Sequence, residues 1–165
     1  MAKGKEKEEE AAPETEAEEP LVASELDERT HAEVLMLYHE SAESIRFGKS
    51  QQWTTLGSTL AVFVILGLIG IHAPKADFLF KLLIALSIAT SVGSIYSLVI
   101  YQFWQNTERE KITSIAERLS NFTRRVRGYT SPREANVHRY VLLTFMALTI
   151  VLANWVLILT VSRAP

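Results

Sequence analysis

Residues 82–107, LLIALSIATSVGSIYSLVIYQFWQNT, are the stretch that decides the fold. They are 26 consecutive residues without Lys, Arg, Asp or Glu. Two further stretches are also free of these residues: 54–73, with 20 residues, and 140–162, with 23. An α-helix rises about 1.5 Å per residue, so each stretch is long enough to cross a hydrocarbon core about 30 Å thick. The sequence therefore predicts an all-α membrane protein with three transmembrane helices, and it argues against a small soluble globule.

The composition excludes several kinds of functional site. The chain has 165 residues, a formal net charge of -2 and no cysteine, which excludes disulfides, cysteine-ligated metals and a cysteine nucleophile. The segment from His39 to Glu43 has only part of the spacing of a zinc motif, because the second histidine is missing. No phosphate-binding or nucleophile motif occurs either. We therefore expect no enzyme activity, no cofactor and no metal.

The chain begins with a strongly acidic segment. Residues 1–20 hold three Lys and eight Glu, and they contain no Val, Ile, Leu or aromatic residue. Such a segment cannot bury enough apolar area to offset the entropy of ordering it, so we expect a disordered acidic tail. A solvating role is the favoured interpretation, and docking of a basic partner is the alternative.

Residues 21–52 have the pattern of an amphipathic helix. An apolar stripe with steps of 4, 4 and 3 residues runs through Val34, Tyr38, Ala42 and Ile45. We expect this juxtamembrane helix to lead into a first span at about 53–72. The stretch from His72 to Asp77, with Pro74, predicts a tight turn into a second span at about 78–104. Together, residues 53–104 form a transmembrane hairpin.

Residues 105–131 predict a separate amphipathic helix and a basic loop. Apolar residues recur with heptad spacing typical of a coiled coil at Ile112, Ile115, Leu119, Phe122 and Val126. Thr107 and Glu110 fit a capping box at the start of this helix, and Gly128 fits its end. A helix over 107–127 leaves only four residues before the next helix. We therefore expect a bend near Gln105–Thr107, after which the helix lies along the membrane surface or packs obliquely against 26–52.

The last segment, 132–165, predicts a helix that starts near Pro132 and crosses the membrane at about 140–161. Basic residues on the loop before this span set the expected orientation. The segment from Thr107 to Arg139 has a net charge of +4, and its eight basic residues are Arg109, Lys111, Arg118, Arg124, Arg125, Arg127, Arg133 and Arg139. Because positive loops stay in the cytoplasm, we expect a multi-pass protein of the cytoplasmic membrane with its N-terminus inside and its C-terminus outside.

Small residues mark candidate packing positions within the spans. In the second span they recur at a spacing of four, at Ala85, Ala89, Gly93 and Ser97, and the first span has Gly57 and Ala61. Packing of these two spans on each other within one chain is the favoured interpretation. The alternatives are a homo-oligomer seam or a pore lined by Ser87, Ser91 and Ser94. Asn154 is an expected packing or assembly residue, with Thr90, Ser94 or another subunit as partner. Because it lies nearer the outer end of the span than the middle, water is the alternative partner.

No charged residue lies deep in any span, which argues against a proton-coupled transporter. The arginines of the basic loop are candidate ligands for anionic lipid headgroups, and they also serve as the topology signal. These candidates are Arg124, Arg125, Arg127, Arg133 and Arg139. Nucleic acid is disfavoured as a partner because the cluster lies at the bilayer.

The segment 37–53, LYHESAESIRFGKSQQW, leads into a two-span hairpin, and an amphipathic helix with Glu117-Arg118-Leu119 follows. This layout, over about residues 35–127, resembles small bacterial membrane proteins of the SLATT type. The resemblance implies a pore-like effector of bacterial conflict systems. The third span and the acidic tail depart from the family layout, and no functional residue is carried over.

The expected function is that of a small accessory, assembly or scaffolding protein of a bacterial inner membrane. It would act through helix–helix and membrane-surface contacts, without catalysis. Its partners would be the lipid bilayer with its anionic lipids and either another membrane protein or further copies of itself. The alternative is a homo-oligomeric pore-forming effector with the second span lining the pore.

Overall fold

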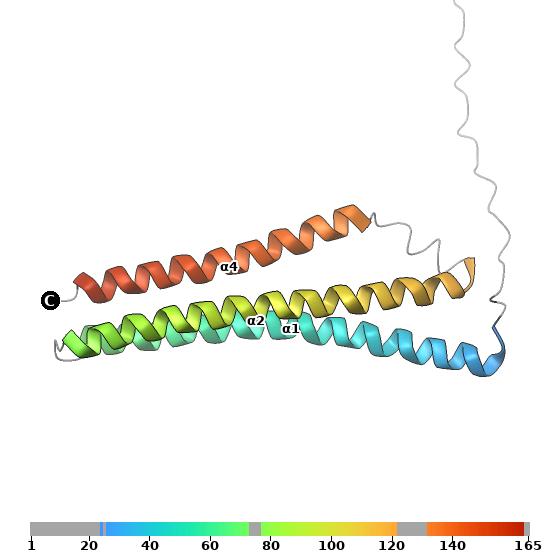
Figure 1. The fold of residues 1–165 in the computed structure, drawn as a ribbon, viewed down its shortest axis with the longest axis horizontal. Helices are drawn as coiled ribbons and strands as arrows, with labels where there is room; N and C mark the ends of the chain where they lie inside the picture. The colour runs from blue at the N-terminus through green and yellow to red at the C-terminus, as the bar shows by residue number, and fades with distance from the viewer. Residues whose placement is uncertain (1–23, 25, 73–76, 122–131, 164–165) are drawn as a thin grey trace, which may run out of the picture.

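The computed structural model describes residues 24, 26–72, 77–121 and 132–163, and this part of the chain is helical without any strand. It contains three helices, α1 (Glu28–His72), α2 (Asp77–Arg118) and α4 (Pro132–Arg163), shown in Figure 1. Each helix includes a stretch long and apolar enough to cross a membrane. Over these residues, the prediction of helices without strands is confirmed, and so is the prediction of three helices long and apolar enough to cross a membrane. The predicted acidic tail, 1–20, lies outside the described residues.

The predicted bend near Gln105–Thr107 is wrong, because α2 is one continuous helix to Arg118. Thr107 does not cap a new helix, since its hydroxyl donates to the carbonyl of Phe103 within the same helix, at 3.3 Å. The capping box and the separate helix over 107–127 are therefore wrong as well. Gly128, the predicted end of that helix, lies outside the described residues.

The early end of α2 is the physical reason that no bend is needed. The N–H of Leu119 donates to the carbonyl of Ala116, a tight final turn just beyond the helix. Thirteen residues, 119–131, then separate α2 from α4 instead of four. Thirteen extended residues reach about 43 Å, which is enough for a return from the far end of a straight helix.

The predicted juxtamembrane helix and the first span are likewise a single element. α1 runs without a break for 45 residues. Its start is capped by Asp27, whose carboxylate accepts the N–H of Thr30 at 3.3 Å. The two amphipathic segments expected beside the membrane are thus extensions of α1 and α2, not separate helices.

α1 and α2 pack side by side along their length, and α4 lies against both. The buried residues of α1 follow steps of 7, 4, 4, 3, 4 and 3, which is the seven-residue period of two helices in long contact. They are Ser41, Gly48, Gln52, Leu56, Thr59, Phe63 and Leu66. All three helices contribute to the apolar core, which comprises Leu56, Phe63, Leu66, Leu83, Leu98, Met146, Ile150, Leu157 and Val161.

Exposed aromatic residues mark one end of the apolar part of the bundle. Trp53 of α1, Phe103 and Trp104 of α2 and Tyr140 of α4 are all exposed. Such rings favour the headgroup level of a bilayer, so we call this level the aromatic boundary. The stretch of α1 from Glu28 to Trp53 extends about 37 Å beyond it, at 1.5 Å per residue.

Gly48 and Gly70 sit where neighbouring helices approach most closely. A Cβ at Gly48 would lie 3.0 Å from Cγ of Gln105, and one at Gly70 would lie 2.6 Å from Cγ2 of Val161. At Gly57, by contrast, a Cβ would meet nothing within 4 Å. The close contact of α1 with α2 therefore depends on Gly48 and not on Gly57.

We predict that Gly48→Leu destabilises the bundle by about 1–3 kcal/mol, because the added side chain overpacks the α1–α2 seam. Gly57→Leu is the matched control on the same helix, and its effect should stay within about 0.5 kcal/mol. Thermal unfolding of the purified protein in detergent, followed by circular dichroism, measures both. Equal losses for the two variants would contradict the packing described here.

Candidate functional site

A chain of polar side chains crosses the bundle at the level of the aromatic boundary. The Nε2 of Gln52 donates to the carbonyl of Leu98 at 3.3 Å and reaches Oε1 of Gln102 at 3.5 Å. Nε2 of Gln102 in turn donates to Oδ1 of Asn106 at 3.2 Å. Gln52 and Gln102 are only 4% and 5% exposed, so these amides find their partners inside the protein.

The same chain continues to α4. Nδ2 of Asn106 donates to the hydroxyl of Tyr140 at 3.5 Å, and the guanidinium of Arg139 donates to Oδ1 of Asn106 at 3.2 Å. Arg139 also donates to Asn136, one turn earlier. We call Gln52, Gln102, Asn106, Arg139 and Tyr140 the boundary network. It links all three helices at one depth, and so it sets the register of α4 against the α1–α2 pair.

Beyond the boundary network, the α1–α2 seam becomes charged. Glu108 is 7% exposed, and Nζ of Lys111 donates to its carboxylate at 2.6 Å. The Lys111 ammonium, and next the hydroxyl of Ser41 on α1, hold the pKa of Glu108 below its usual value of 4.5. The adjacent rings of Phe47 and Trp104 pack edge to face, with centroids 6.1 Å apart.

Gln105 is the least satisfied residue of this seam. It is 4% exposed, and among the described residues its Nε2 has no hydrogen-bond partner. Its side chain packs against Gly48 instead. Leaving a buried amide donor unpaired costs about 1–3 kcal/mol, so close packing at Gly48 offsets a local electrostatic penalty.

Within the apolar part, three hydroxyl groups of α2, those of Ser87, Ser91 and Ser94, lie inside the bundle. Thr59 donates its single proton to the carbonyl of Thr55 at 2.7 Å, so Ser94 must be the donor in the 2.6 Å contact between Thr59 and Ser94. Ser87 and Ser91 are buried, and they donate to carbonyls one turn earlier on α2. These serines therefore have partners inside one chain.

The stripe of small residues on α2 does not pack within the chain. Ala85, Ala89 and Gly93 are exposed, and a Cβ at Gly93 would meet nothing within 4 Å. Ser97 is half-buried and its hydroxyl donates to the carbonyl of Gly93. The preference for packing of the first two spans through these residues is wrong, and the same holds for the exposed Gly57 and Ala61. Interhelical close approach uses Gly48, Gly67 and Gly70 instead.

Asn154 is half-buried in the apolar part of α4, and its Oδ1 is buried without a partner among the described residues. The two partners expected within the chain bond elsewhere. Thr90 donates to the carbonyl of Leu86 at 2.8 Å, and Ser94 bonds to Thr59. Another subunit and water are the two expected partners that remain predictions.

The predicted headgroup arginines are only partly described. Arg139 is held in the boundary network, so it contributes to helix packing. Arg133 lies in the first turn of α4, but its side chain is outside the described residues. Arg124, Arg125 and Arg127 lie outside the described residues altogether.

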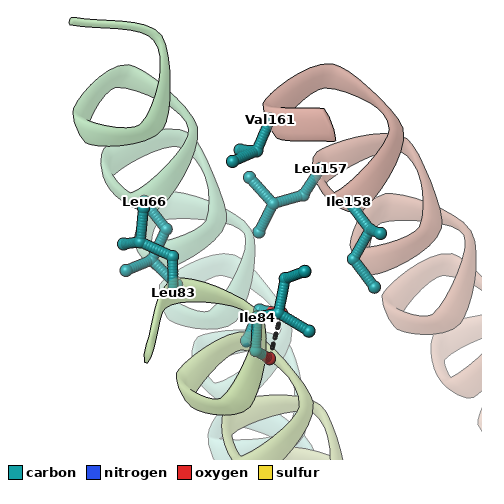
Figure 2. Close-up of a pocket in the computed structure, with 7 residues that line it drawn as sticks. Leu66, Leu83, Ile84, Leu157, Ile158 and Val161 are labelled. Carbon is teal, nitrogen blue, oxygen red and sulfur yellow. Dashed lines mark hydrogen bonds between the residues drawn. The ribbon is translucent and has the colours of Figure 1, made fainter. Parts of the chain in front are cut away.

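Figure 2 shows a small cavity between the three helices at the end far from the aromatic boundary. Its volume of about 10 Å³ holds no more than a single water molecule. The one polar group in its wall, the hydroxyl of Ser87, already donates to the carbonyl of Ile84. The remaining lining residues have apolar side chains: Leu66, Leu83, Ile84, Leu157, Ile158 and Val161. This cavity is a packing gap and not a ligand site.

Over the described ranges, no three His, Asp or Glu side chains come together as a metal site would need.

Comparisons with protein families, curated proteins and solved structures find no match to this chain. The resemblance to SLATT-type proteins therefore stays a prediction. The boundary network and the seam beyond it are the candidate functional region, and their chemistry is that of helix positioning.

We predict that the contribution of Glu108 to stability depends on pH. Its pKa is lower in the folded protein than the 4.5 of the unfolded chain. Its stabilising effect is therefore complete above about pH 4.5 and is lost as the pH falls through the folded pKa. Wild type should melt higher than Glu108→Gln at pH 6, and the gap should close on acidification towards pH 3.

Thermal unfolding of both proteins between pH 3 and pH 7 measures this gap. Glu117→Gln, at an exposed position of the same helix, is the matched control. A gap between wild type and Glu108→Gln that stays constant over the whole range would show that the ion pair contributes nothing.

Proposed function

We propose that this chain is a membrane-embedded scaffold that assembles membrane proteins and has no catalysis of its own. The observation that carries the proposal is the continuity of α1 and α2 across the aromatic boundary. Both helices leave the apolar part as one packed pair, so the protein presents a rigid two-helix projection beyond the bilayer. A rigid projection with a fixed height and direction suits a docking platform.

The internal contacts support the rigidity of this projection. The seam stays buried beyond the boundary, through Glu108, Ile112 and Ala116 on α2 and Leu119 just after its end. The boundary network fixes α4 against the pair at its base. Because no hinge interrupts either helix, movement of one end is transmitted to the other.

We propose that the two-helix projection lies on the cytoplasmic side of a bacterial-type inner membrane. The segment from Thr107 to Arg139 carries eight basic and four acidic residues, whereas the turn between α1 and α2 has one Lys and one Asp. The excess of Lys and Arg near span ends favours the cytoplasmic side. The C-terminus would then lie outside.

Lateral assembly in the bilayer would use the outward stripe of α2. Ala85, Ala89 and Gly93 leave its surface without bulky side chains, so a second transmembrane helix can approach closely there. The serines that a pore lining would need have partners within the chain instead. This pattern favours assembly over a pore lined by those groups.

The test is affinity purification of the tagged chain in mild detergent, combined with a dye-leakage assay on cells that express it. We expect a stoichiometric membrane-protein partner or a homo-oligomer, together with a tight membrane. Gly93→Leu should lower recovery of the partner about tenfold without unfolding the chain, because a loss of about 1.4 kcal/mol is tenfold in affinity.

Val92→Leu is the matched control, since Val92 is 63% exposed on the same helix beside Gly93. A monomer that co-purifies with nothing would contradict the scaffold. Leakage that depends on expression of the chain would favour the pore instead.

A further inference from the structure

The distal part of α1 carries an exposed apolar patch that lipid tails do not reach. Leu35, Met36 and Leu37 are 47%, 65% and 48% exposed. Met36 lies 17 residues before Trp53 on an unbroken helix, or about 25 Å beyond the aromatic boundary at 1.5 Å per residue. Three consecutive exposed apolar residues so far from the bilayer indicate a contact with protein.

The surroundings of this patch are acidic. Residues 30–45 include Glu33, Glu40 and Glu43, which are all exposed, and no Lys or Arg. On a helix, Glu33 and Glu40 lie three residues before and four residues after Met36, so they flank it on the same face. We call Glu33, Leu35, Met36, Leu37 and Glu40 the α1 patch. Its charge selects a basic partner surface.

Two segments of the same chain are poorly suited to bind the α1 patch of their own copy. The N-terminal residues 1–20 have a net charge of −5 from three Lys and eight Glu, and no Val, Ile, Leu or aromatic side chain. They share the sign of the patch and lack apolar groups to cover it. The connector 119–131 joins α2 to α4, whereas Met36 lies about 140° around α1 from Ser41, which faces α2.

The connector nevertheless has the complementary chemistry. Residues 119–131, LSNFTRRVRGYTS, carry three Arg and no Asp or Glu, and they include Phe122 and Val126. This combination of guanidinium groups and apolar side chains matches the acidic rim and apolar centre of the α1 patch.

The ends of the connector also lie at the height of the patch. Gln105 packs against Gly48, so the end of α2 at Arg118, 13 residues further, is level with about residue 35 of α1. Asn106 bonds to Tyr140, so the start of α4 at Pro132 is level with about residue 40 of α1. A second copy in the same membrane therefore holds both ends of its connector level with the neighbouring patch.

We propose that the α1 patch binds the basic connector 119–131 of a second copy of this chain. The proposal rests on the assembly function proposed above and names its partner. The contact is head to tail, because the patch of one copy meets the connector of the next. Repeated contacts of this kind close into a ring or extend into a row within the membrane.

Disulfide cross-linking in membranes tests this contact, and the absence of native cysteine gives a clean background. One tagged chain carries Met36→Cys and a second, differently tagged chain carries Val126→Cys. A disulfide requires the two Cβ atoms to approach to about 4 Å, so it reports direct contact. The matched control pairs Val126→Cys with Ser114→Cys, an exposed position of α2 at a similar height.

We expect the yield of the disulfide between positions 36 and 126 of different chains to be at least about fivefold that of the control. This factor is the stabilisation that one good surface ion pair gives to a contact. Glu40→Arg in the first chain should reduce the yield severalfold. Arg124→Glu with Arg125→Glu in the second chain should restore it. Unchanged circular dichroism spectra check that each variant folds.

Three results would overturn the proposal: a yield no higher than that of the Ser114→Cys control, a dominant disulfide between two Met36→Cys chains, or a disulfide within one chain that carries both cysteines. The proposed scaffold function survives these results if a different membrane protein still co-purifies. It fails separately if the chain co-purifies with nothing.

Discussion

The continuous contact between α1 and α2 is the constraint on which the rest of the structure depends. The contact follows one seven-residue period along the whole pair. It runs from Leu66, near the turn between α1 and α2, to Ser41, on the polar side of the aromatic boundary. A helix that leaves a bilayer would lose the surrounding lipid and would have to stay folded in water. Each helix here buries the same face against the same neighbour on both sides of the aromatic boundary.

The chemistry of the seam changes with its surroundings. Inside the apolar part, Leu56, Phe63 and Leu98 pack with few polar contacts. At the boundary the seam contains the hydrogen-bonded amides of Gln52 and Gln102. Beyond the boundary, Lys111 donates a hydrogen bond to Glu108. Polar groups with directional bonds fix the register of the helices, whereas apolar packing alone tolerates sliding. The boundary network therefore determines where α4 sits and, through α4, where the connector ends.

The three candidate spans could be predicted because a helix surrounded by lipid needs about 20 residues without charge, whatever its neighbours are. That pattern can be found in the sequence alone. The details depended on neighbours that a single sequence does not display. Thr107 and Glu110 have the residue types of a capping box, but the same types occur inside helices, and the continuing seam against α1 kept α2 intact. The expected bend also assumed a helix as far as residue 127, whereas α2 ends at Arg118.

The candidate packing residues show a similar limit. A spacing of four identifies one face of a helix, as for Ala85, Ala89 and Gly93, but it does not say what that face contacts. Gly48 is not among the predicted packing residues, although the period through Ser41, Gly48 and Gln52 would have placed it in the seam. Arg139 has a partner one helix away, Asn106, and nothing in the local sequence indicates that pairing.

A scan of single cysteines along α2, from Ala89 to Arg118, tests whether this helix crosses the boundary intact. Each variant is treated with a membrane-impermeant maleimide in sealed vesicles of both orientations. No labelling is expected as far as about Phe103. From Thr107 onwards we expect labelling from the cytoplasmic side alone, with an unbroken period of about 3.6 residues. A loss of that period at 105–107, or labelling within the span, would contradict a helix that crosses the boundary intact.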